Sequence, residues 1–287
     1  MPANLYRLFV YLELSFLVFR NLSLKDLVLF SHSGAQARKM FRAFMATRFD
    51  NAMSPFIPRS ILAPFRTTLR QASAVIVGSV SASFIRLDMD TSAFYSPVDL
   101  NILTPNGTST AWALFFQAAN AYCVPAVART RFNSFLVSFK RYKLPGIAHP
   151  RYITIGEVSN ASVLPAVFYA ETTAQMTMLT CERVVIPYDI SLNGLCVAGL
   201  HADEDEVWFV SGYKPFTPAA DLQACGAACR YIDRESVGFS GMKETEWSLS
   251  VDMEWQDVRR SNVKWRLGNV CDNRHCPNSG KKIRLSH

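Results

Sequence analysis

Apolar residues in the first fifty positions recur at the three- and four-residue spacing of an amphipathic helix. The pattern runs through residues 5–19 and then through Leu24–Phe30, behind a capping box that begins at Ser23. A second capping box, Ser33-Gly-Ala-Gln36, precedes another apolar stripe. This stripe consists of Ala37, Met40, Phe41, Phe44 and Met45. The sequence therefore predicts a helical layer over residues 1–52.

Two short apolar runs after these helices have the length of buried strands. The first, Ala74-Val-Ile-Val-Gly-Ser79, ends in a Gly-Ser pair at the start of a predicted helix over residues 80–87. The second, Val98–Leu103, carries Asp99 and Asn101 two positions apart, which places both side chains on one face of the strand. We expect the two strands to lie side by side.

Alternating polar and apolar residues predict another strand pair, Phe132–Phe139 and Arg151–Val158, joined through the turn at Pro145-Gly146. Glu157 lies on the second strand of this hairpin. If that strand neighbours the strand of Asp99, Glu157 is a candidate second carboxylate for the same site.

The remaining segments predict packing elements without chemistry of their own. Thr108–Tyr122 is a helix whose aromatic face is typical of a core, although such rings can also stack on a base. Thr172–Thr180 is predicted as a short helix, and Val184–Pro187 as a strand closed by its proline.

The order of these motifs resembles the nucleotidyltransferase fold, in which a Gly-Gly or Gly-Ser turn precedes an acid-x-acid strand and a third acid follows on a later strand. Gly78-Ser79 and Val98-Asp-Leu-Asn101 carry this resemblance. The chain also resembles a set of proteins from mushroom-forming fungi, in which an F-box-like N-terminus precedes a nucleotidyltransferase-like region. The matching segments there include residues 22–30, 172–180 and 271–277.

These resemblances imply an α/β (α+β) fold: a small mixed sheet of nucleotidyltransferase type with flanking helices and an N-terminal helical cap. They imply an F-box-like region over residues 1–52 and a nucleotidyltransferase-like domain over residues 53–287. The opening Leu-Pro-x-Glu of the F-box is absent. The N-terminal helices are therefore either a protein-docking surface or a layer that simply covers the sheet.

The resemblance also implies roles for individual residues. Gly78 and Ser79, with Asp99 and Asn101, would bind a nucleotide. Asp99 and Glu157 would be catalytic in an active enzyme, and together with Asn101 they would hold Mg²⁺. Two-metal transfer needs several ionised oxygens beside the triphosphate, whereas Asn101 supplies only a neutral carbonyl.

We therefore expect a noncatalytic nucleotidyltransferase-like binding or interaction protein without a resident cofactor. One alternative is a metal-dependent nucleotidyltransferase that uses Mg²⁺ and a nucleoside triphosphate. The other alternative is an F-box-like substrate receptor of a ubiquitin ligase, with a protein partner on the N-terminal helices.

Composition supports a globular protein of 287 residues, with 49% apolar and 18% charged residues. The net charge of +7 concentrates in residues 38–70, 129–143 and 259–284, which could meet a nucleotide or nucleic acid or could be a solvated basic surface. The apolar stretch at residues 5–19 contains charged residues and is too short to span a membrane, so we expect no membrane partner.

Seven cysteines, an odd number, are typical of reduced thiols in an intracellular protein, either cytoplasmic or nuclear. Cys225 and Cys229, with Cys271 and Cys276, form two short-spaced pairs that could hold Zn²⁺. Their spacings are wider than the usual two-residue knuckle, so unligated cysteines are the alternative.

Overall fold

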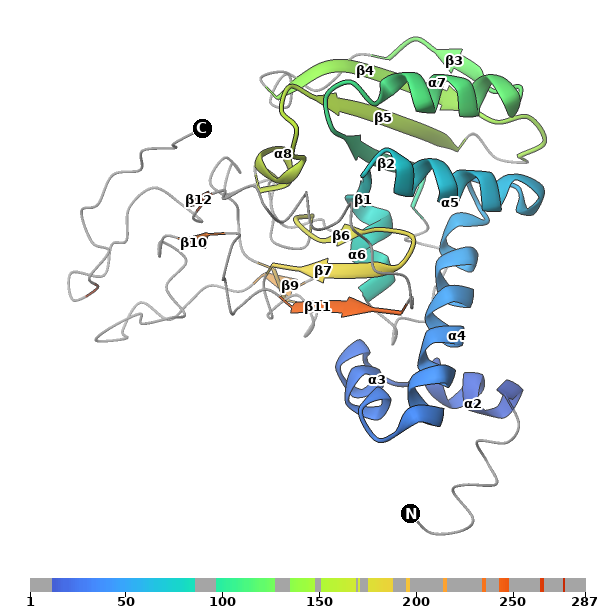
Figure 1. Cartoon of the computed structure of the whole chain (residues 1–287), viewed down its shortest axis with the longest axis vertical. Helices are drawn as coiled ribbons and strands as arrows, with labels where there is room; N and C mark the ends of the chain where they lie inside the picture. Colours follow the sequence, from blue (N-terminus) through green and yellow to red (C-terminus); the bar gives the residue numbers. More distant parts are fainter. Residues whose placement is uncertain are drawn as a thin grey trace.

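The computed structural model describes residues 12–85, 97–126, 135–147, 151–168, 170, 175–187, 195–196, 214–215, 234–235, 243–247, 264–265 and 276. These residues form a mixed α/β fold around one eight-stranded sheet, with helices packed on it and an N-terminal helical layer (Figure 1). The predicted fold class is confirmed, although the sheet is larger than the small one expected.

The N-terminal helices are α2 (Leu12–Phe19), α3 (Leu24–Ser31) and α4 (Ala35–Met53). Ser23 caps α3 as predicted, because its hydroxyl accepts a hydrogen bond from the backbone N–H of Asp26 at 3.1 Å. The second predicted capping box is wrong. The N-terminal cap of α4 is Gly34, with no side-chain hydrogen bond, because the preceding serine belongs to the turn that ends α3.

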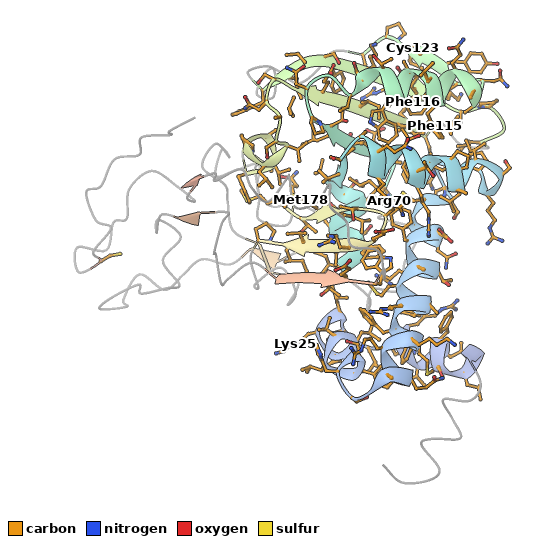
Figure 2. All side chains as sticks on the ribbon, in the orientation of Figure 1. Lys25, Arg70, Phe115, Phe116, Cys123 and Met178 are labelled. Atoms are coloured by element: carbon orange, nitrogen blue, oxygen red, sulfur yellow. The ribbon has the colours of Figure 1, made fainter. Side chains whose placement is uncertain are left out.

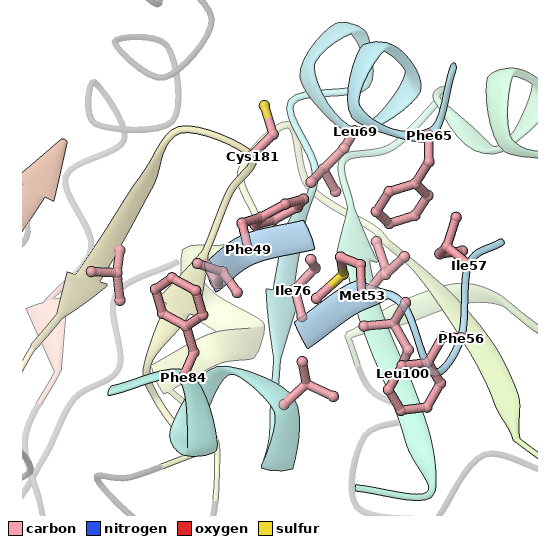
Figure 3. Packing of buried hydrophobic residues seen from close by; sticks show 14 of the residues in the cluster. Phe49, Met53, Phe56, Ile57, Phe65, Leu69, Ile76, Phe84, Leu100 and Cys181 are labelled. Carbon is pink, nitrogen blue, oxygen red and sulfur yellow. The ribbon is translucent and has the colours of Figure 1, made fainter. Parts of the chain in front are cut away.

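Helix α4 extends from α2 and α3 toward the sheet and so connects the N-terminal helices to it (Figure 1). Its residues Phe49 and Met53 are fully buried and lie beside Ile76 and Leu100, which come from the sheet (Figure 3). One apolar cluster therefore runs from the N-terminal helices into the sheet. Two further helical elements, η1 (Arg59–Ile61) and α5 (Leu62–Gln71), lead into the first strand.

The sheet has the strand order β11-β7-β6-β1-β2-β5-β4-β3. Strands β2 and β5 are parallel, and every other neighbouring pair is antiparallel. The predicted neighbours β1 and β2, and the predicted β4–β5 hairpin, are confirmed. The strands are β1 (Val75–Val77), β2 (Asp99–Thr104), β3 (Tyr122–Val124), β4 (Leu136–Lys143), β5 (Tyr152–Val158), β6 (Met178–Leu179), β7 (Arg183–Ile186) and β11 (Lys243–Glu246).

Two short strand pairs lie outside this sheet. Strand β8 (Leu195–Cys196) pairs with β9 (Lys214–Pro215), and β10 (Arg234–Glu235) pairs with β12 (Lys264–Trp265).

The predicted helix over Thr172–Thr180 is wrong in its described part, where β6 pairs with β1 and β7. Met178 and Leu179 are both fully buried, but they belong to different apolar clusters on opposite faces of the sheet. A helix buries one face, whereas a strand between two packed layers buries both. The apolar segment before it forms a short helix, α8 (Leu164–Phe168).

The aromatic face of α7 (Ser109–Ala118) belongs to the core, as predicted. Phe115 and Phe116 both lie on this helix (Figure 2). Phe116 stacks on Tyr142 with ring centroids 3.9 Å apart, and the ring centroid of Phe115 lies 5.9 Å from that of Phe65 on α5. The Gly-Ser pair is followed by α6 (Ser79–Ile85), also as predicted. None of the helices in the described part of the chain combines the length and apolar character needed to cross a membrane.

Candidate functional site

The two faces of the sheet are covered by different elements. Helices α4, α5, α6 and α7 cover one face, onto which Leu100 and Ile102 of β2 project. Strand residues alternate in direction, so Asp99 and Asn101 project from the opposite face, where Leu103 packs in the cluster that contains α8. We call these the helix-covered face and the α8 face.

A cavity of about 340 Å³ opens on the α8 face, beside the turn between β1 and α6. Gly78 forms this turn with a φ of +78°, a conformation that favours glycine. A Cβ atom at Gly78 would lie 3.3 Å from Nδ2 of Asn101, so the turn and β2 touch. We call this space the Gly78 cavity. Its lining is Val77, Gly78, Asp99, Asn101, Ile102, Leu103, Leu136, Phe139, Arg141, Thr154, Gly156, Ala166, Val167, Ala170 and Gln175.

The structure therefore brings together three of the residues that the sequence singles out, Gly78, Asp99 and Asn101. Ser79 begins α6 directly after the turn and is not part of the cavity lining.

Glu157 does not lie in the Gly78 cavity with these residues. It pairs with Thr104 of β2, three positions from Asn101, and so projects from the helix-covered face. Its carboxylate is buried, 6% exposed, and accepts hydrogen bonds from the N–H groups of Gly107 and Ser109 at 2.7 and 3.4 Å and from the Ser138 hydroxyl at 3.0 Å. Each carboxylate oxygen thus has a protein donor.

The electrostatics of Glu157 follow from these contacts. Burial by itself raises the pKa of a carboxyl group, but hydrogen bonds from Ser109, Ser138 and Gly107 outweigh it and hold the pKa of Glu157 below its usual value. The ionised form is therefore the one that the fold stabilises. Through its hydrogen bonds to Gly107 and Ser109, this carboxylate anchors the turn before α7 to strand β5.

The structure places two other polar residues in the cavity that sequence reasoning missed. Thr154 lies directly opposite Asn101 on β5, and Arg141 lies opposite Thr154 on β4. Thr154 is 5% exposed, and within the described part of the chain neither its hydroxyl nor the buried Nε of Arg141 has a hydrogen-bond partner. The Arg141 guanidinium lies 5.2 Å from the ring centroid of Tyr152. Only the strand register could have identified this pair, because neither residue belongs to a motif.

The donor set of the cavity does not fit a two-metal site. Among the described residues of the lining, Asp99 is the one carboxylate, Asn101 is neutral, and Arg141 adds a positive charge. Magnesium prefers several charged oxygens, and a guanidinium beside them opposes its binding. Within the described ranges no group of three His, Cys, Asp or Glu side chains could hold a metal ion. Of the predicted zinc ligands, Cys276 is buried, and Cys225, Cys229 and Cys271 lie outside the described residues.

Comparison with known proteins finds structural likeness only. No protein-family model matches the sequence, and a search of curated proteins finds no match. Several solved structures align over part of the chain. One, described as "The structure of CCA-adding enzyme apo form I", is 12% identical with a TM-score of 0.35, over 52% of this chain and 35% of that one.

The second, "The complex structure of CCA-adding enzyme with CTP", is 13% identical with a TM-score of 0.33, over 51% of this chain and 35% of that one. The third is a tRNA nucleotidyltransferase complexed with a primer tRNA and an incoming ATP analog. It is 12% identical with a TM-score of 0.27, over 39% of this chain and 30% of that one. The aligned part is about a third of each of these proteins. At these values the likeness assigns no activity, substrate or partner to this chain.

Proposed function

We propose that this chain is a nucleotidyltransferase-like protein that binds a nucleotide in the Gly78 cavity and does not catalyse nucleotidyl transfer. The observation that carries the proposal is the placement of a neutral amide, Asn101, beside Asp99 at the Gly78 turn. Glu157, the other candidate carboxylate, is committed to hydrogen bonds on the opposite face. One ionised carboxylate is too little charge for two-metal displacement.

The dimensions and chemistry of the cavity support a small-molecule ligand. Its volume of about 340 Å³ lies within the usual range for such sites, roughly 300–1,000 Å³. Apolar walls from residues such as Val77, Leu103 and Phe139 surround a few polar groups, which is the usual composition of a ligand pocket. An apolar wall suits a base, and the polar groups suit phosphate and sugar.

Calorimetric titration with ATP, GTP, CTP and UTP tests this function. We expect saturable binding of at least one nucleotide, weakened tenfold or more by Asn101→Ala and unchanged by Asn106→Ala on the exposed turn after β2. A pyrophosphate-release assay with an RNA acceptor should stay at background. Magnesium-dependent release that Asp99→Ala abolishes would instead establish the metal-dependent nucleotidyltransferase.

We also propose, as a second function, that the N-terminal helices dock a protein partner in the manner of an F-box. Leu17 on α2 and Leu29 on α3 are 55% and 60% exposed, and Leu14 and Val18 on α2 are exposed as well, at 46% and 41%. The double variant Leu17→Asp/Leu29→Asp should lose co-purification with a cullin-type ligase adaptor, and Leu114→Asp on α7, equally exposed at 62%, should retain it. Equal retention by both variants would exclude this function.

A further inference from the structure

We infer that the Gly78 cavity holds the phosphate groups of its ligand through Arg141 and Thr154, without a divalent cation. This inference rests on the proposed nucleotide binding and specifies how it is achieved. It follows from two buried donor atoms of the cavity lining, the Thr154 hydroxyl and the Arg141 Nε, that have no hydrogen-bond partner among the described residues.

The strand register makes the two residues neighbours. Arg141 of β4 pairs with Thr154 of β5, and Thr154 pairs with Asn101 of β2, so the three side chains form a row across the α8 face. The row reaches the Gly78 turn, because Asn101 lies against that glycine. Three adjacent strands therefore present a guanidinium, a hydroxyl and an amide to one space.

Burial makes the absence of partners informative. Thr154 is only 5% exposed, and the Arg141 Nε atom is also buried. A buried polar atom without a hydrogen bond destabilises a fold, so native proteins keep few of them outside functional sites. Each of these two atoms would gain its missing hydrogen bond from a ligand oxygen.

The chemistry of the pair selects an anion. The Nε–H of arginine can only donate, and the threonine hydroxyl can donate to the same group. Phosphate oxygens accept such bonds strongly, and the planar guanidinium matches their geometry. The Tyr152 ring, 5.2 Å from the Arg141 guanidinium, helps to hold the cation in place.

Asp99 is not part of the row formed by Arg141, Thr154 and Asn101. It pairs with Tyr152, two residues before Asn101, which is about 6.5 Å further along the strand. A single carboxylate at that distance accepts hydrogen bonds from ligand hydroxyl or amino groups, while Arg141 supplies the positive charge that metal ions supply in two-metal sites. Nucleotide affinity should therefore be the same with and without magnesium.

The test is calorimetric titration of the full chain with ATP and with inorganic tripolyphosphate, each in excess EDTA and in excess MgCl2. We expect dissociation constants that agree within threefold between the two buffers. Arg141→Gln should weaken both probes at least tenfold. Lys140→Gln, which removes the same charge from the exposed neighbour on β4, should leave both unchanged.

Thr154→Val keeps the shape of the side chain and guards against misfolding as an explanation. We expect it to weaken both probes at least threefold while raising the Tm of the free protein. Thr177→Val is the matched control, since Thr177 is also buried with an unpartnered hydroxyl but lies outside the cavity lining. It should raise the Tm without changing either affinity.

Two results would overturn the inference, and they differ in what they say about the proposed function. ATP binding that requires magnesium and is indifferent to Arg141→Gln and Thr154→Val would refute metal-free phosphate binding and leave nucleotide binding intact. Failure of every nucleotide to bind in either buffer would refute both.

Discussion

On strands β2, β4 and β5, the buried polar groups of the two sheet faces differ in whether the protein satisfies their hydrogen bonds. On the helix-covered face, Glu157 accepts three hydrogen bonds, and Thr104 accepts one from the Trp112 ring at 3.2 Å. On the α8 face, the Thr154 hydroxyl and the Arg141 Nε are buried beside a cavity and have no hydrogen-bond partner in the residues that the structure describes. All these strand residues lie on β2, β4 or β5, so the difference is one of face and not of element.

This comparison distinguishes buried polar groups that stabilise the fold from buried polar groups that are available to bind a ligand. A buried polar group that the protein satisfies fixes a turn or a helix, as Glu157 does for the turn before α7. A buried polar group that the protein leaves unsatisfied weakens the free fold. Of such groups among the described residues, those of Thr154 and Arg141 line the Gly78 cavity, where a ligand could satisfy them. The four predictions below test this distinction in order of expected effect.

The largest effect should come from the apolar centre of the helix-covered face. Trp112 is 1% exposed and contacts Phe65, Phe115 and Phe116. Trp112→Ala should lower the free energy of unfolding by about 3–5 kcal/mol, because it leaves a cavity and removes the hydrogen bond to Thr104. Urea denaturation of the wild type and the variant measures this difference in the free energy of unfolding.

The matched control is Leu114→Ala on the same helix, which is 62% exposed and should change stability by less than about 0.5 kcal/mol. Similar losses for the two variants would mean that this face is not the tightly packed layer described above.

Glu157→Ala should come next, at about 2–4 kcal/mol, because it leaves the Gly107 N–H and the Ser138 hydroxyl without an acceptor. Nucleotide affinity should not change, since Glu157 lies outside the cavity lining. A loss of affinity with unchanged stability would place this carboxylate in the binding site after all.

The pH dependence of stability gives a second test of Glu157. Its folded-state pKa lies below the unfolded value, so its ionised form stabilises the fold above the unfolded pKa of about 4.3 and this contribution is lost as the pH falls through the folded pKa. Thermal denaturation of Glu157→Gln should therefore show a flatter decline below about pH 4.5 than the wild type. Identical slopes would contradict the assigned hydrogen bonds.

Gly78→Ala should have a smaller effect on stability, about 1–2 kcal/mol, because residue 78 has a φ of +78°. Its Cβ would also press on the Asn101 amide at 3.3 Å and narrow the cavity, so nucleotide affinity should fall. Gly107→Ala is the control, with a φ of +84° but no atom within 4 Å of its Cβ. It should cost similar stability and leave affinity unchanged; equal affinity losses would remove Gly78 from the site.

Sequence reasoning could predict strands β1, β2, β4, β5 and β7, the Gly-Ser turn and the proximity of Gly78, Asp99 and Asn101, because short apolar runs, period-two alternation and a glycine at a strand end are local signals. It could not decide which face Glu157 takes. Strand residues alternate, so a change of one position in register moves a side chain to the other face. The β2–β5 register pairs Asn101 with Thr154 and Thr104 with Glu157.

The same limit explains why Arg141 and Thr154 escaped notice, since they meet only through strand pairing between distant segments. It also explains the misassigned helix at residues 172–180. Met178 and Leu179 form a strand because the edge of β1 was open to pairing, and a short apolar run does not distinguish a strand from a helix.

The most direct test is the same substitution on the two faces, Thr104→Val and Thr154→Val, compared by thermal denaturation with and without ATP. Both threonines are buried, but the Thr104 hydroxyl is hydrogen-bonded to Trp112 and Thr108, whereas the Thr154 hydroxyl has no partner among the described residues. We expect Thr104→Val to cost about 1 kcal/mol and keep the ATP-induced rise in Tm, and Thr154→Val to gain about 1 kcal/mol and lose most of that rise. Equal destabilisation by both variants, with the ATP response unchanged in each, would contradict the account.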